Sequence, residues 1–322
     1  MIKNAKNWKG LLYGVAYGLL ARGIFGLEPD YLQSYIHAGE LMTKSFLFLV
    51  PFAMGLIAAY CNDTIKQPGK IVSLIMPLFA VIGFVGISVL IGWEGFICAL
   101  MALPIFACMA LLGALIGVNI FKRNRNKVLV SILLALPFVF APIESQFKLD
   151  EKIFSEHTSI IIDAPDEVVW QNLTRVRPIT ESENKPSLFQ FMGFPRPLEA
   201  ELDTVAVGGV RKAIFDRGLF FTETVTQMQP LRTLAFSIEA DPNSIPPAAL
   251  DEHVMVGGQY FDVLEGRYKI EKLDDGKILL HLSSQFRLST RFNFYSGFWS
   301  QLIMRDIQEN ILEIIKNRCR QP

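Results

Sequence analysis

Charged residues and cysteine are both scarce in this sequence. Asp, Glu, Lys and Arg make up 19% of the 322 residues, whereas hydrophobic residues make up 51%. This balance excludes a disordered chain, a collagen-like fibre and an ordinary soluble enzyme. None of the four cysteines forms a CxxC pair, and only Cys319 lies after residue 149. A disulfide within the second half of the chain is therefore excluded.

Metal and nucleotide motifs are lacking as well. The sequence has four histidines: His37, His157, His253 and His281. They show no HxxxH or HxH spacing, so we expect no metal site. The pairs Gly208-Gly209 and Gly257-Gly258 match neither a phosphate-binding loop nor a dinucleotide-binding pattern. We therefore expect no cofactor.

The formal net charge is zero, but the charges divide unevenly along the chain. Residues 1–149 hold 12 Lys and Arg and 6 Asp and Glu, whereas residues 150–322 hold 19 and 25. The first part is predicted to be membrane and the second an aqueous domain, whose acidic balance argues against nucleic acid. The predicted boundaries are a transmembrane helical region over 1–143, a polar linker over 144–154 and a folded domain over 155–322.

Five apolar runs fit the ~20 residues that cross a bilayer core. They cover 10–27, 45–60, 71–92, 96–119 and 128–143. Trp93-Glu94-Gly95 separates the third run from the fourth, which predicts a helical hairpin. The fifth run is short and contains Pro137 and Pro142. An N-terminal helical membrane bundle of about five spans is the prediction.

Lys and Arg in the short loops predict the orientation of this bundle. If the N-terminus is cytoplasmic, the inside segments carry nine of them and the outside segments 28–40 and 93–95 carry none. Five spans at the inner or cell membrane then place the C-terminal domain outside the cytoplasm. Four spans would place it inside, so the fifth span decides the side.

One face of the first run is a stripe of small residues. Gly10, Gly14, Gly18 and Gly26 repeat at a spacing of four, with Arg22 among them. Glycines at this spacing allow another helix to approach closely, so self-association through Gly14 and Gly18 is a candidate interaction. Arg22 either faces the bundle interior or extends to the outer headgroups.

The second half is predicted to contain a strand, two helical pieces, an antiparallel meander and a long helix. The strand covers 157–163, one helix begins near Pro165, and another covers 184–192. Turn residues separate six further β-type runs: 199–205, 208–216, 219–229, 231–240, 259–273 and 277–288. An apolar stripe at three/four spacing, which includes Phe298 and Trp299, predicts a final helix over 295–318.

The opening SIIIDAPDEVVWQNL, the meander and the final amphipathic helix resemble the SRPBCC superfamily, the START-like or polyketide-cyclase-like helix-grip fold. The segments PPAALDEHVMVGGQYFDVLEGRYKIEKL and RLSTRFNFYSGFW look like bacterial members of unassigned function. The resemblance covers about 155–318 and none of the first half. It implies an α+β domain in which a curved antiparallel sheet surrounds the helix and encloses a deep apolar pocket. The superfamily shares no catalytic motif, so the resemblance leaves the chemistry open.

Strand alternation and helix phase give candidates for the pocket lining. On the strands they are Glu223, Phe236, Tyr268 and Asp262, the last inward-facing unless a bulge intervenes. On the final helix they are Trp299, Asp306 and Asn310. An inward carboxylate is costly unless it is paired or protonated. Each carboxylate is therefore either a polar anchor for a ligand or half of a structural ion pair, with Arg211, Arg287 or Arg291 as possible partners.

His253 is the candidate acid/base residue of this domain, because imidazole titrates near neutral pH. It follows the proline-rich segment 241–252, which is long enough to cover a pocket mouth. No nucleophile is tied to it by spacing, and the alternative is an exposed or capping loop histidine.

Three functions compete on these observations. The first is a membrane-anchored protein that binds a lipid or another hydrophobic small molecule. The second is an SRPBCC-type enzyme, similar to a polyketide cyclase/dehydratase or a hydrolase. The third is a structural or sensory module whose interior is filled by its own side chains.

Overall fold

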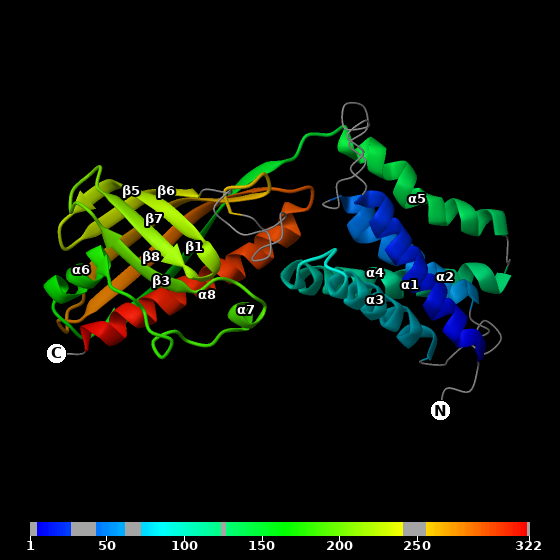
Figure 1. The fold of residues 1–322 in the computed structure, drawn as a ribbon, viewed down its shortest axis with the longest axis horizontal. Helices are drawn as coiled ribbons and strands as arrows, with labels where there is room; N and C mark the ends of the chain where they lie inside the picture. Colours follow the sequence, from blue (N-terminus) through cyan, green and yellow to red (C-terminus); the bar gives the residue numbers. More distant parts are fainter. Residues whose placement is uncertain (1–4, 27–42, 62–71, 124–126, 241–255, 321–322) are drawn as a thin grey trace. The chain divides into compact units, whose positions relative to one another are not determined.

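The computed structural model describes residues 5–26, 43–61, 72–123, 127–240 and 256–320. The chain divides into two compact units, Met1–Leu149 and Asp150–Pro322 (Figure 1). Several loop positions that set the predicted orientation lie outside the described residues, among them Lys66, Lys70 and Arg125. The orientation therefore stays a prediction.

The first unit is helical at all five predicted apolar runs. Its elements are α1 (Ala5–Phe25), the π-helical segment η1 (Ser45–Leu49), α2 (Val50–Cys61), α3 (Val72–Leu90), α4 (Phe96–Arg123) and α5 (Lys127–Ser145). Two stretches of the described helices are long and apolar enough to cross a membrane, Phe96–Phe121 and Lys127–Ser145.

The predicted bundle of five spans is not supported. The apolar segments Ser45–Cys61 and Ile75–Leu90 are helical but shorter than a bilayer core requires. In α1, Lys9, Arg22 and several glycines interrupt the apolar sequence. The prediction used the length of each apolar run between loops. Whether a segment can cross a membrane depends instead on the length of the continuous apolar helix within that run.

Glycines set the distance between α2 and α4. A Cβ at Gly113 of α4 would fall on the backbone carbonyl of Phe52, and a Cβ at Gly55 of α2 would fall on that of Ala110. The two helices therefore cross in backbone contact, which only small residues permit.

The glycine stripe of α1 packs against another helix of the same chain. A Cβ at Gly14 would lie 3.1 Å from the Cβ of Ala80, and a Cβ at Gly18 would lie 2.9 Å from the ring of Phe84. Both neighbours belong to α3. Self-association through Gly14 and Gly18 would have to break these contacts, because one helix face cannot pack against two helices at once.

Arg22 connects α1 to the turn between α3 and α4. Its Nε lies 2.5 Å from Oε1 of Glu94, and its guanidinium lies 5.8 Å from the ring centroid of Trp93. The positive charge of Arg22 is therefore neutralised by the Glu94 carboxylate in the Trp93-Glu94-Gly95 turn.

We predict that Gly113→Ala destabilises the first unit, because the added methyl group must displace the carbonyl of Phe52 and separate α2 from α4. Gly86→Ala in α3 is the matched control, since nothing lies within 4 Å of the Cβ it would add. Thermal unfolding of the full chain in detergent should show a lower midpoint for Gly113→Ala only. Equal midpoints for both variants would contradict the close crossing.

The described residues of the second unit form an antiparallel sheet and three α-helices. Its strands are β1 (Glu151–Ile162), β2 (Arg175–Val176), β3 (Pro197–Leu202), β4 (Val210–Phe215), β5 (Phe220–Gln229), β6 (Thr233–Ala240), β7 (Phe261–Lys272) and β8 (Ile278–Ser289). Their order in the sheet is β1-β8-β7-β6-β5-β4-β3-β2, so the first strand pairs with the last. The helices are α6 (Asp166–Thr174), α7 (Leu188–Phe191) and α8 (Asn293–Cys319).

The six predicted meander strands and the long final helix are confirmed, and with them the α+β arrangement of a curled sheet and a C-terminal helix (Figure 1). Two boundaries differ. The polar linker expected over 144–154 is shorter, because α5 continues to Ser145 and β1 begins to pair with β8 at Glu151. The helical piece expected over 184–192 reduces to the single turn of α7.

Small and polar residues of α8 hold it against β1 and β8. A Cβ at Gly297 would lie 2.6 Å from the ring of Phe154, so α8 approaches β1 as closely as glycine allows. About two turns of the helix further on, Arg305 forms a 2.7 Å ion pair with Glu156. The Gln308 side chain then accepts a hydrogen bond from Thr158 Oγ1 at 3.0 Å and donates one to Ser284 Oγ at 2.9 Å.

The predicted apolar stripe of α8 is therefore wrong in its first half. Phe298, which the stripe turns toward the sheet, is 55% exposed, while Ser296, Gly297 and Ser300 are buried. The reason is the close approach to β1, which leaves no room for an aromatic side chain on that face. In the second half Leu312, Ile314 and Ile315 are buried, as the large apolar residues of an amphipathic helix should be.

Candidate functional site

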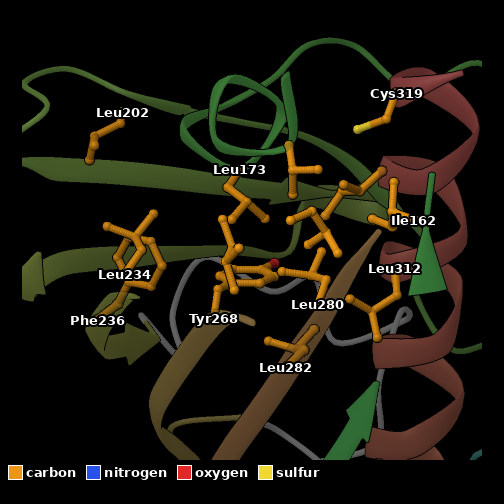
Figure 2. Packing of buried hydrophobic residues seen from close by; sticks show 14 of the residues in the cluster. Ile162, Leu173, Leu202, Leu234, Phe236, Tyr268, Leu280, Leu282, Leu312 and Cys319 are labelled. Carbon is orange, nitrogen blue, oxygen red and sulfur yellow. The ribbon is translucent and has the colours of Figure 1, made fainter. Parts of the chain in front are cut away.

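One end of the space between sheet and α8 is filled by the protein's own side chains. Leu173 of α6, Leu234 and Phe236 of β6, Leu280 of β8 and Leu312 of α8 are all at most 1% exposed and belong to one cluster. Figure 2 shows these side chains converging from the sheet, α6 and α8. This end is a packed core and has no room for a ligand.

Within this core lies a buried ionic cluster. The Nε of Arg211 donates a short hydrogen bond to Oε2 of Glu223, and Nη1 donates to the carbonyl of Leu173 at 3.1 Å. The guanidinium also lies 4.0 Å from the ring centroid of Phe236 and 5.9 Å from that of Tyr268. Three of the predicted pocket residues, Glu223, Phe236 and Tyr268, thus come together around one arginine.

The surroundings shift the pKa values of two groups in this cluster, Arg211 and Tyr268. Burial by itself lowers the pKa of Arg211, but the neighbouring Glu223 and Tyr268 together outweigh it, and the net pKa is raised. Burial raises the pKa of Tyr268 more than the Arg211 charge lowers it. Arg211 therefore stays charged and Tyr268 neutral at pH 7. A general acid or base must exchange protons near the working pH, so these two groups suit a structural role.

The other polar candidates lie on α8. Trp299 is half-buried, and its Nε1 is a buried donor with no hydrogen-bond partner among the described residues. Asp306 is also half-buried, and within the described part of the chain it has no hydrogen-bond or ion-pair partner. Seven residues separate them, which places both on one face of the helix, about 10 Å apart along its axis. Large side chains near them, such as Leu302 and Ile307, are only half-buried.

Asn310 has a different environment from Trp299 and Asp306. Its Oδ1 accepts a hydrogen bond from the backbone N–H of Lys185 at 3.0 Å, and its Nδ2 donates to Oδ1 of Asn184 at 2.9 Å. The amide predicted to face a ligand is thus used to hold the segment before α7.

A second contact holds the same segment against the end of α8. Glu183 accepts a 2.6 Å hydrogen bond from the Nε of Arg318, which lowers the pKa of the carboxyl to about 2. Nothing in the pattern of 177–187 indicates this attachment, because the contacts are made by side chains more than 120 residues apart in the sequence.

Asp262 lies on the face of the sheet opposite to the core. The pairing of β7 with β8 shifts between Val263 and Glu265, which is the bulge that would reverse the alternation. Val263 therefore shares the face of the fully buried Phe286, and Asp262 pairs across the strands with Arg287. Burial raises the pKa of Asp262 more than the charge of Arg287 lowers it. Asp262 is therefore not a lining residue of the space beside α8.

Two of the histidines meet in the sheet, although their positions in the sequence give no indication of it. The Nε2 of His157 on β1 lies 3.1 Å from Nδ1 of His281 on β8, and Nε2 of His281 lies 3.4 Å from a carboxylate oxygen of Glu271. No group of three or more potential ligands that could hold a metal ion occurs among the described residues. His253 and the segment 241–252 lie outside them, so the acid/base prediction stays a prediction.

An open hollow of about 570 Å³ lies beside the start of α6 and the β5–β6 turn. It is lined by Asp166, Gln229, Pro230, Leu231, Arg232, Thr233, Lys269, Ile270 and Lys272. Lys272 forms a 2.6 Å ion pair with Asp166, which lowers the pKa of that carboxyl. This charged lining is unlike the mostly apolar lining of small-molecule pockets.

No protein-family model matches this chain, and no curated protein is significantly similar to it. Solved structures similar to it include the Zhui aromatase/cyclase from Streptomyces sp. R1128, with 15% identity and a TM-score of 0.34 over 53% of this chain and 95% of that one. A protein from Nitrosospira multiformis has 16% identity and a TM-score of 0.32 over 52% and 97%. A protein from Arthrobacter aurescens has 15% identity and a TM-score of 0.33 over 52% and 87%.

We predict that Arg211→Met in the fragment 150–322 costs about 3–5 kcal/mol of unfolding free energy, because it leaves the buried Glu223 carboxylate unpaired. The double variant Arg211→Met with Glu223→Leu should recover much of this loss. Lys277→Met, which removes one half of an exposed pair with Asp275, is the control and should change little.

Urea unfolding followed by circular dichroism measures all three variants. If Arg211→Met cost no more than Lys277→Met, the cluster would be hydrated and this end of the domain would be open to water.

Proposed function

We propose that this chain is a membrane-anchored protein whose second unit binds a hydrophobic small molecule or lipid beside Trp299 and Asp306. The observation that carries the proposal is a pair of polar groups on one face of α8, the Trp299 indole N–H and the Asp306 carboxylate, for which the described residues supply no hydrogen-bond partner. Buried polar groups are almost always hydrogen-bonded, so the buried indole N–H is a donor that an acceptor on a ligand would satisfy. The half-buried Asp306 carboxylate offers an acceptor two turns along the helix.

These two groups restrict the chemistry of the ligand. It should carry an acceptor, such as a carbonyl or ester oxygen, for the Trp299 N–H. It should carry a donor, such as a hydroxyl or amine, about 10 Å away for Asp306. Between them its body should be apolar, because Leu302, Ile303 and Ile307 are the neighbouring side chains on α8. An amphiphilic lipid or a hydroxylated hydrophobic molecule has this pattern.

Exposed apolar side chains in the first unit support the membrane anchor. Only 28% of the apolar window in Phe96–Phe121 and 17% of that in Lys127–Ser145 is buried, whereas the core helix of a soluble protein is mostly buried. Leu12, Phe79, Leu115 and Val139 are among the side chains at least half exposed. Lipid would cover such surfaces, which a monomeric soluble protein rarely presents to water.

Asp306→Asn and Trp299→Phe test the binding site. Trp299→Phe removes the indole donor, and Asp306→Asn replaces a charged acceptor with a neutral one. A loss of about 0.5–1.5 kcal/mol raises the dissociation constant about 2- to 13-fold, so less ligand should remain bound. The full chain would be purified from membranes and its bound small molecules quantified by mass spectrometry. Glu309→Gln, on an exposed position of α8, is the matched control. Unchanged occupancy in both test variants would exclude this face of α8 as the site.

The finer proposal on location is that the N-terminus is cytoplasmic and the second unit lies outside the cytoplasm. Its support is the excess of Lys and Arg in one set of loops, nine against none. Alkaline phosphatase fused after Pro322 should be active, and green fluorescent protein at the same position should be dark. The reverse pattern would place the unit in the cytoplasm and show an even number of spans.

A further inference from the structure

The first turns of α8 carry an exposed aromatic surface formed by Phe294 and Phe298. Their side chains are 73% and 55% exposed and lie one turn apart on the same side of the helix. The segment 292–299 contains five aromatic residues, of which Phe292 is buried and Trp299 half-buried. The helix therefore turns part of this aromatic run inward, while the other described residues leave Phe294 and Phe298 exposed.

This surface lies beside the point at which the chain enters the second unit. The Nδ2 of Asn293 donates a 2.5 Å hydrogen bond to the carbonyl of Asp150, and Oδ1 accepts one from the backbone N–H of Thr290 at 2.9 Å. The first turn of α8 is thus fixed next to the start of β1. This attachment belongs to the second unit alone.

The chain before Asp150 restricts how far this point can be from α5. α5 ends at Ser145, and five residues of extended chain reach at most about 17 Å. α5 is one of the two helices long and apolar enough to cross a membrane. Lys148, Asp150, Glu151 and Lys152 are all exposed, so this stretch carries no net charge.

We propose that Phe294 and Phe298 insert into the interfacial layer of the lipid bilayer that holds α5. The proposal rests on the membrane anchoring stated under the proposed function. Aromatic rings favour the boundary between headgroups and acyl chains. Trp299 follows Phe298 directly, so this docking would place the candidate binding face next to the layer that contains lipid.

The test measures the depth of a fluorescent label in the full chain. The four native cysteines are replaced by alanine, and Phe298→Cys, labelled with nitrobenzoxadiazole, is reconstituted in vesicles of phosphatidylcholine and phosphatidylglycerol. Val207→Cys is the matched control. Val207 is 63% exposed but lies in the β3–β4 turn, at the end of the sheet opposite to the start of β1.

Quenching by spin-labelled lipid should be severalfold stronger at position 298 than at position 207, and quenching by aqueous iodide should be weaker. Adding Phe294→Ser should reduce the lipid quenching at position 298. Equal quenching at 298 and 207 would overturn the proposal.

A third label, at Val139→Cys in α5, separates this inference from the anchoring on which it rests. Val139 is 56% exposed within the apolar helix. Lipid quenching at 139 without quenching at 298 means that α5 is anchored and the aromatic surface is not docked. Without lipid quenching at 139, the membrane anchoring itself fails.

Discussion

The antiparallel pairing of β1 with β8 is the interaction on which the second unit depends. It joins twelve residue pairs, from Glu151↔Ser289 to Ile162↔Ile278. More than 100 residues of chain lie between the two strands, so the pairing closes a long loop and its entropic cost must be offset by many hydrogen bonds at once. The meander β3–β7 continues the sheet on the side of β8 away from β1, and α8 follows directly from β8. Without this pairing α8 would have no β1 surface to pack against.

The close contact of α8 with β1 divides the interior into two parts. Gly297, Ser296 and Ser300 bring the helix onto the sheet at one end, and this forces the large side chains of that half toward other directions. At the other end Leu312 and Ile315 join the core around Arg211 and Glu223. A buried ion pair contributes little net stability, but it fixes which groups face each other. The end of the interior that holds it is thus rigid and filled, which leaves the Trp299 and Asp306 face as the candidate binding surface.

The first unit uses backbone contact where the second uses side-chain packing. Gly55 and Gly113 let α2 and α4 cross closely, and Gly14 and Gly18 do the same for α1 against α3. Apolar side chains that would fill a core in water point outward instead.

The sequence by itself determined the secondary structure and the division of the chain. Apolar runs predicted the five helices of the first unit, and alternation with turn residues predicted the six meander strands and the long final helix. These features are local, because the period of the side chains and the turn residues act within a few positions. Periodicity also identified Glu223 and Tyr268 as inward-facing, since β5 and β7 keep their alternation there.

Only the tertiary structure decided the rest. The bulge after Val263 reversed the face of Asp262. The close contact of α8 with β1 at Gly297 turned Phe298 outward. Asn310 and Arg318 of α8 bind the segment before α7, whose sequence shows no periodic pattern. Each of these outcomes depends on which distant surface packs against a residue and how much space remains for its side chain. A sequence period records that a side chain is apolar or polar, but the distance between two packed elements is set by all the residues of both.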